Sequence, residues 1–299
     1  MKSMRKIYLL FAISFAVFVS NAQEAITNGS KENPVGEFAG KNPITFNASL
    51  HTGISTAANH YMSSNAYEGL TYGVHVDLGR FYNSSKTVSW NLAFDNLSSV
   101  NTVGGLENNA KTSSMGYTGM NLNYSSFYNW MFGKGLMVKV GGGLDFSGDM
   151  MTNLTHKTNN AVSVNVLTQL EASAGICYTF KFEKWMLGLY GNVSTPFAGL
   201  VFTDSKHESG VGSLSSDRLM DSYFSHLKGT SFSNLQGFDF DLGIKFVAPR
   251  VAITLGLVTE NRWWYVNEIQ NCRENVLFRL GASFNLVSLK QTKTIHPYF

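Results

Sequence analysis

The segment from Gly135 to Gly148, GLMVKVGGGLDFSG, restricts the fold more than any other feature of the sequence. From Leu136 onward, every second residue is Leu, Val, Gly or Phe, and the residues between them include Lys139 and Asp145. Alternation with a period of two is typical of a β-strand whose two faces meet different surroundings. The segment therefore predicts a strand with one apolar face and one polar face.

The same alternation recurs along the chain and predicts ten strands. They lie near residues 44–54, 70–78, 88–94, 120–130, 136–146, 162–180, 185–193, 238–246, 251–257 and 276–286. In a secreted β-sandwich, the apolar faces of two sheets would pack together and the polar faces would meet water. That alternative suits one or two of these strands better than all ten, because the apolar faces also end in aromatic residues.

The connections between the predicted strands alternate between short and long. Short ones lie near 83–86, 132–135, 182–184 and 248–250, and long ones near 57–66, 98–113, 149–160, 203–234 and 267–273. Short turns on one rim and long loops on the other are typical of transmembrane β-barrels. The sequence therefore predicts an all-β fold, a transmembrane up-and-down antiparallel barrel of about ten strands, within a range of 8–12. An even number of strands would place both ends of the barrel on the short-turn, periplasmic rim.

The first residues predict export. Lys2, Arg5 and Lys6 precede an apolar run at 7–19 and the small-residue pattern Ser20-Asn21-Ala22, as in a cleavable signal peptide. The run falls short of the roughly 20 residues of a membrane-spanning helix, which disfavours an uncleaved anchor. We expect a signal peptide at 1–22, a periplasmic segment at 23–43, the barrel at 44–290 and a C-terminal tail at 291–299.

Composition excludes several classes of protein. Only 14% of residues are charged and 13% are aromatic, which disfavours intrinsic disorder. A net charge of +3 gives no support for binding nucleic acid. No catalytic, nucleotide-binding or metal motif is present, so the sequence indicates no cofactor and no metal, and it favours a role other than catalysis. Cys177 and Cys272 are expected at opposite rims, and therefore as free thiols; a disulfide between them is the alternative for an exported chain.

Large aromatic side chains occur near the ends of the predicted strands. Trp90, Trp130 and Trp185 lie close to short turns, and Trp263 and Trp264 lie at the far end of the ninth strand. Aromatic rings favour the interface between membrane and water. These five tryptophans are therefore predicted to belong to two aromatic girdles.

The polar faces of the strands contain two groups of titratable residues. Pairing the strands about their turns brings His51, His75 and Asp95 to a similar height. A histidine beside a carboxylate is a weak candidate for a general base or a metal ligand, and a hydrogen-bonded structural cluster is the favoured interpretation. The second group, the predicted lumen charge network, consists of Lys139, Glu171, Asp239, Asp241, Glu260, Arg262 and Arg279.

Strand pairing also predicts contacts within the lumen charge network. It brings Glu260 towards Arg279 and Lys139 towards Glu171. Opposite charges in a confined lumen would pair, because an unpaired buried charge is costly. A network that fills a narrow barrel is the favoured interpretation, and a polar constriction that selects a solute is the alternative.

Several features resemble bacterial outer-membrane β-barrel proteins: the signal sequence, the alternating strands and the terminal Tyr298-Phe299. The Gly- and Asn-rich strands and the cleavage region resemble those of the Bacteroidota. The resemblance implies an outer-membrane location, contact with outer-membrane lipid and recognition of the terminal phenylalanine by the barrel-assembly machinery. The tail at 291–299, which contains Pro297, departs from the pattern, since such barrels usually end on the last strand.

Function is less constrained than fold. The longest predicted loop, Thr203–Asn234, has mixed charge and is either a solvated surface loop or the site of an extracellular ligand. We expect a barrel with a mostly filled polar lumen that has a structural or surface-interaction role through its long loops. A narrow channel for small polar solutes or ions is the first alternative, and an outer-membrane hydrolase or protease is the second.

Overall fold

The computed structural model describes residues 44–62, 66–82, 87–102, 114–132, 135–155, 162–182, 185–204, 226–248 and 251–285. The strands are β1 (Ile44–Asn59), β2 (Ala66–Tyr82), β3 (Thr87–Thr102), β4 (Ser114–Phe132), β5 (Leu136–Asn153), β6 (Val162–Lys181), β7 (Met186–Phe202), β8 (Leu227–Ser231), β9 (Leu235–Val247), β10 (Ala252–Val266) and β11 (Ile269–Asn285). In the described part of the chain, no helix has the length and apolar character needed to span a membrane. The predicted signal peptide, periplasmic segment and C-terminal tail lie outside the described residues.

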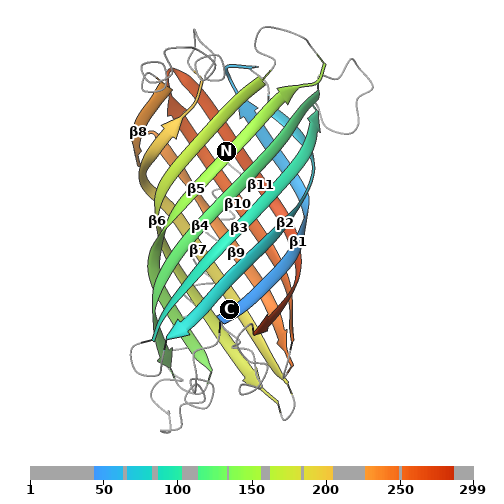
Figure 1. The fold of residues 1–299 in the computed structure, drawn as a ribbon, viewed down its shortest axis with the longest axis vertical. Helices are drawn as coiled ribbons and strands as arrows, with labels where there is room; N and C mark the ends of the chain where they lie inside the picture. The colour runs from blue at the N-terminus through green and yellow to red at the C-terminus, as the bar shows by residue number, and fades with distance from the viewer. Residues whose placement is uncertain are drawn as a thin grey trace, which may run out of the picture.

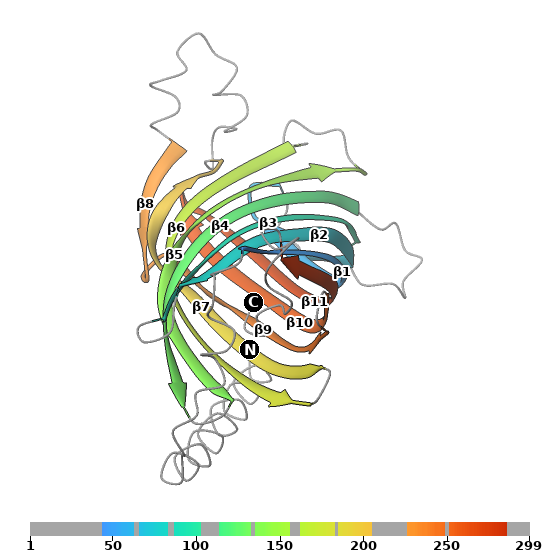
Figure 2. The ribbon, with the colours of Figure 1, turned by 60° about the horizontal axis from the view of Figure 1, so that its bottom comes forward.

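The strands form a closed antiparallel barrel (Figures 1 and 2). Neighbours in sequence pair with each other, and pairing of β1 with β11 closes the ring. Strands β8 and β9 both pair with β7 and share one position in the ring, so the eleven strands fill ten positions. The predicted ten-stranded up-and-down barrel is thus confirmed. Apart from the short β8, which pairs with β7 alone, every strand has two neighbours, so the ring itself is closed.

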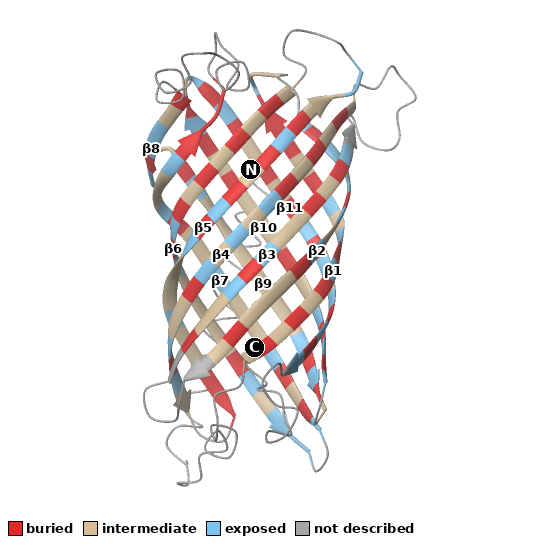
Figure 3. Cartoon of the chain, viewed as in Figure 1, coloured by how far each residue is buried: buried red, intermediate tan, exposed pale blue. Residues whose placement is uncertain are grey.

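Buried and exposed residues alternate along the strands (Figure 3), and many of the exposed side chains are large and apolar, in contrast to a soluble protein. On β1, Leu50 is 63% exposed, whereas the next residue, His51, is 2% exposed. Large apolar side chains such as Tyr72 and Phe278 stand on the outer surface. A soluble β-sandwich buries its apolar faces, so this distribution rules out the sandwich alternative.

One irregularity interrupts the wall where β7 meets β8 and β9. Ser194 pairs with Asp239 and Ala198 pairs with Ser231, so the second strand contains extra residues between these two pairs. Pro196, which has no amide hydrogen to contribute to the ladder, lies on the shorter side. Across the irregularity, the hydroxyl of Thr195 donates a hydrogen bond to the carbonyl oxygen of Gly237 at 2.9 Å. Bulges of this kind redirect nearby side chains.

Two connections differ from the sequence prediction. The expected long connection at 267–273 is a two-residue turn, because β10 continues to Val266 and β11 begins at Ile269. Most residues from 270 to 275 are polar on both faces of the strand, so the sequence shows no apolar alternation there. The predicted loop Thr203–Asn234 contains β8 in its last part, and residues 205–225 lie outside the described residues.

The glycines of the opening segment allow neighbouring strands to approach closely. A Cβ atom on Gly141 would collide with the carbonyl oxygen of Ser126 on β4, and one on Gly143 would collide with that of Tyr124. Glycine, which has no side chain, avoids both collisions. On the same strand, Asp145 is buried in the barrel interior and Leu144 is 47% exposed, as the alternation predicts.

Candidate functional site in the barrel lumen

The polar faces of the strands enclose a cavity of about 260 Å³ in the lumen. Its wall includes residues of both predicted groups, among them His75, Asp95, Lys139, Asp241 and Arg279. These side chains come from β2, β3, β5, β9 and β11, so the cavity is built by both sides of the barrel. Polar groups that converge on a cavity make this the candidate functional site.

The structure brings the predicted group of His51, His75 and Asp95 together. His75 Nδ1 lies 2.6 Å from Asp95 Oδ1, and His51 Nδ1 lies 3.9 Å from the same oxygen. The two imidazole rings are stacked, with their centroids 5.5 Å apart. Strand register explains the contact between His75 and Asp95, because the two residues lie directly opposite each other on β2 and β3.

A fourth residue completes this cluster and was not singled out from the sequence. The second ring nitrogen of His75, Nε2, lies 2.9 Å from Asp77 Oδ2. Asn47 Nδ2 donates a hydrogen bond to the same Asp77 oxygen at 2.7 Å. Asp77 is two residues after His75 and therefore on the same face of β2, which is the signal that identifies it.

The cluster does not provide a general base in this arrangement. A carboxylate accepts hydrogen bonds, so a ring held between Asp77 and Asp95 donates from both nitrogens and is doubly protonated. Such a ring has no lone pair with which to take a proton. Ser49 lies opposite His75 on β1, but among the described residues its hydroxyl has no hydrogen-bond partner. The geometry therefore gives no support to the hydrolase alternative.

Arg262 is the centre of a second cluster. Its guanidinium donates to both carboxylate oxygens of Asp239 at 2.6 Å, and to Glu171 Oε1 at 2.6 Å. Asp239 is on the neighbouring strand β9, whereas Glu171 is on β6, which does not pair with β10. The ion pair between Arg262 and Glu171 therefore crosses part of the lumen next to the β7 irregularity.

The two pairs predicted within the lumen charge network, Glu260 with Arg279 and Lys139 with Glu171, are wrong. Glu260 lies opposite Asn275, which donates a hydrogen bond to it at 2.8 Å, and not beside Arg279. Arg279 instead pairs with Asp241 at 2.8 Å. Each of these errors arose from an assumed turn centre, because a small shift of the centre changes every cross-strand partner.

Lys139 is also not paired with Glu171. It lies opposite Gly175, and its ammonium group sits 4.7 Å from the ring centroid of Phe127. Arg279 additionally donates from Nε to His51 Nε2 at 3.0 Å, which links the histidine cluster to the charge network.

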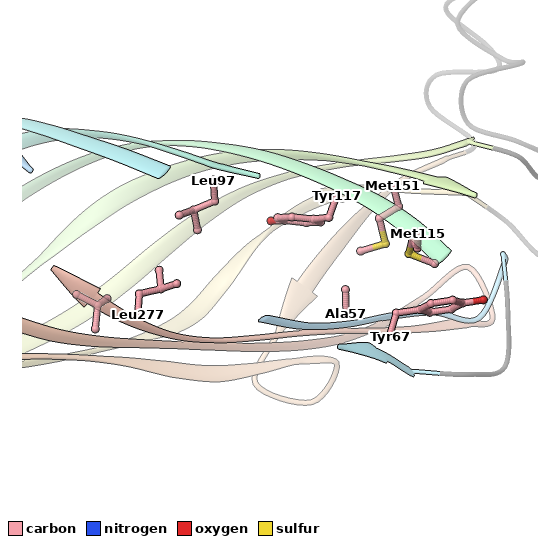
Figure 4. Close-up of a cluster of buried hydrophobic side chains, with 8 residues drawn as sticks. Ala57, Tyr67, Leu97, Met115, Tyr117, Met151 and Leu277 are labelled. Carbon is pink, nitrogen blue, oxygen red and sulfur yellow. The ribbon is translucent and has the colours of Figure 1, made fainter. Parts of the chain in front are cut away.

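Apolar side chains fill the lumen towards the long-loop rim. One cluster comprises Ala57, Tyr67, Leu97, Met115, Tyr117, Met151, Val258 and Leu277. A second comprises Leu167, Val201, Leu235, Trp264 and Val266. Together these thirteen residues, here called the apolar plug, come from every position in the ring. Figure 4 shows members of the first cluster pointing across the lumen from facing walls.

Polar contacts across the barrel accompany the apolar plug. Asn59 on β1 donates a hydrogen bond to Ser163 on β6 at 2.7 Å, and these strands lie on opposite sides of the ring. Arg273 on β11 donates to the hydroxyl of Tyr117 on β4 at 3.0 Å. Arg273 is not among the predicted lumen residues, because residues 267–273 were expected to form a loop. Apolar clusters and polar contacts that cross the barrel thus occur together at this end of the lumen.

The predicted girdle needs one correction. Trp264 is 2% exposed and belongs to the apolar plug, because the residue after it, Tyr265, takes the outward position. Trp130 and Trp185 stand exposed on the outer face. Trp90 and Trp263 are partly exposed. Cys177 and Cys272 are free thiols, as predicted, and Cys272 lies within β11.

A closed antiparallel barrel with an apolar outer face and a polar interior defines an outer-membrane β-barrel fold. The chain belongs to the family described as "protein of unknown function (DUF3316)", whose profile matches residues 9–293. A comparison with curated proteins found no match.

Several solved barrels are similar to this chain at low identity. Neisserial surface protein A is 9% identical over 81% of this chain and 97% of that chain, with a TM-score of 0.34. The outer membrane protease OmpT from Escherichia coli is 7% identical over 87% and 100%, with a TM-score of 0.48. The translocator domain of the autotransporter NalP from Neisseria meningitidis is 9% identical over 91% and 98%, with a TM-score of 0.43. The fold assignment rests on the strand pairing and the apolar outer face.

Proposed function

We propose that the protein is an outer-membrane barrel that does not conduct ions and that serves as a structural or surface-interaction scaffold. The observation that carries this proposal is the apolar plug, to which every position in the ring contributes. Water and ions would have to cross a layer of packed apolar side chains. Hydrophobic constrictions of this kind block conduction.

The predicted signal peptide and the apolar outer face support a location in the outer membrane. Contact with outer-membrane lipid and insertion by the barrel-assembly machinery follow from that location. The long connections on one rim would then face the outside of the cell, and the loop within Thr203–Asn234 is the part of the chain most suited to an extracellular ligand.

Single-channel recording from the refolded protein in a planar bilayer tests the proposal. A heat-modifiability gel would first confirm that the barrel is folded. We expect the unmodified protein to be electrically silent. The double variant Tyr117→Ala with Met151→Ala removes two large side chains from the apolar plug, and we expect it to show discrete conductance steps.

The matched control is Tyr124→Ala with Met150→Ala, which removes the same two residue types from the outward faces of β4 and β5. It should remain silent. Discrete, ion-selective steps from the unmodified protein would contradict the proposal and favour a narrow channel. In that case, neutralising Arg262 or Arg279 should change the ion selectivity.

A further inference from the structure

We propose that His51, His75 and Asp95 bind a divalent transition-metal ion in the lumen, and that zinc is the ion best suited to them. Two imidazoles and one carboxylate form the donor set that zinc takes in many protein sites. The three residues come from three consecutive strands, β1, β2 and β3, whose register is fixed by continuous pairing. The site is thus held by rigid elements rather than by loops.

The ligand atoms are close to the spacing that a metal requires. One atom from each residue lies within 4.8 Å of the other two, and the separations from Asp95 Oδ1 are 2.6 Å to His75 and 3.9 Å to His51. Ligands at the zinc bond lengths of a tetrahedral site lie roughly 3.4 Å apart. Movements of about 1 Å by side chains would therefore place all three atoms around one ion.

His75 already has the outer hydrogen bond that metal-binding histidines usually make. Its Nδ1 faces Asp95, and its Nε2 donates to Asp77 at 2.9 Å. Asp77 is held in turn by Asn47. A carboxylate behind a histidine fixes the ring orientation and raises its basicity as a ligand. Asp95 and Asp77 together also supply the two negative charges that balance a divalent ion.

His51 supplies an independent observation that points to a ligand. The residue is 2% exposed, and within the described part of the chain its Nδ1 has no hydrogen-bond partner. Buried polar atoms normally have a partner. This nitrogen points towards Asp95 Oδ1, which is where the proposed ion would lie.

Arg279 opposes binding of the ion. Its Nε donates to His51 Nε2, which leaves the proton of that ring on Nδ1. Binding through Nδ1 requires this proton to move to Nε2 and Arg279 to release the ring. Arg279 would keep its ion pair with Asp241 at 2.8 Å. The ion would also replace the proton shared by His75 and Asp95, so one proton leaves for each ion bound.

The cavity provides the remaining position around the ion. His75 and Asp95 both line it, so a water molecule from the cavity can serve as the fourth ligand. Zinc sites with three protein ligands and one water are open to further ligands. The site therefore differs from a closed structural zinc site.

Metal titration of the folded, tag-free protein tests this proposal. Cobalt(II) should bind one ion per barrel and give the visible absorption of tetrahedral coordination, and zinc should displace it. His75→Gln and Asp95→Asn should each abolish this stoichiometric binding. Asp77→Asn, which removes the negative charge behind His75 but keeps a side chain of the same size, should weaken binding by about 10–100-fold. Arg279→Gln should tighten it by about tenfold, because a nearby positive charge is removed.

His60→Gln is the matched control, because His60 lies exposed beyond the end of β1. It should bind cobalt as the unmodified protein does. A heat-modifiability gel would show that each variant is folded. Equal binding by His75→Gln and the unmodified protein would overturn the proposal, and so would the absence of any saturable cobalt or zinc binding. Either result would leave the conductance test unaffected, since the apolar plug contains none of these residues.

Discussion

At the scale of single residues, the lumen is organised by the need to give each buried polar group a partner. Arg262 is 3% exposed and satisfies Glu171 and Asp239 together. Its fork-shaped group donates from Nη1 and Nη2 to the two oxygens of Asp239, and Nη2 donates to Glu171 as well. Alternation along the strands placed these residues on inward faces, but Lys139, the partner predicted for Glu171, was wrong, because side chains from non-neighbouring strands meet only once the ring has closed.

Removing this guanidinium should destabilise the barrel strongly. Arg262→Met leaves two carboxylates facing each other without a counter-charge, and we expect a loss of about 3–5 kcal/mol in the free energy of unfolding. Urea unfolding in lipid vesicles, followed by tryptophan fluorescence, would measure it. Adding Glu171→Gln to this variant should recover part of the loss. A loss below about 1 kcal/mol for the single variant would show that the pair contributes little.

At the scale of elements, the local sequence determines whether a segment forms a strand, but it does not determine which residues of neighbouring strands pair. The alternation of β5 was sufficient to predict its two faces. The extent of β10 and β11 was not predicted, since the turn that joins them has no glycine. Asn267 and Glu268 both have positive φ angles, 54° and 63°. Tight hairpin turns of this kind favour Asn followed by Gly, so Glu268 departs from the preferred sequence.

Replacing Glu268 with glycine should stabilise this hairpin. The left-handed conformation raises the energy of a residue with a Cβ atom by about 1–2 kcal/mol. Glycine avoids this steric energy, although ordering glycine on folding has a larger entropic cost. We expect Glu268→Gly to raise the free energy of unfolding by about 0.5–1 kcal/mol in the same urea assay. Glu68→Gly, an exposed position within β2, should instead lower it by a similar amount. Destabilisation by Glu268→Gly would show that the side chain matters more than the backbone strain.

At the scale of the whole molecule, the barrel combines an apolar exterior, a polar middle and an apolar plug near one rim. The exterior suits lipid, because exposed residues such as Leu144, Leu255 and Leu280 lie along the strands. The plug was not expected from the sequence. Some of its members, such as Met151 and Val201, lie where both faces of a strand are apolar, so alternation alone gave no sign of their direction.

A charge on the outer face should reveal how deeply each position lies in lipid. Leu144→Arg places a cation in the middle of β5, and we expect it to cost about 2–4 kcal/mol in the free energy of unfolding from vesicles. Leu154→Arg makes the same change just beyond the end of β5 and should cost about 0–1 kcal/mol. Equal losses of unfolding free energy at the two positions would show that Leu144 does not lie deeper in the lipid than Leu154.

The sequence by itself determined the class of fold, the number of ring positions and the face on which most side chains lie. These follow from period-two alternation and from the spacing of turns, which depend only on neighbouring residues. The tertiary structure alone decided that His75 faces Asp95, that Arg262 reaches Glu171 and that Trp264 points inward. Such contacts depend on turn geometry, on the β7 irregularity and on the stagger at which β1 meets β11. A change of two residues in any register gives every lumen side chain a different partner, and no local pattern encodes that choice.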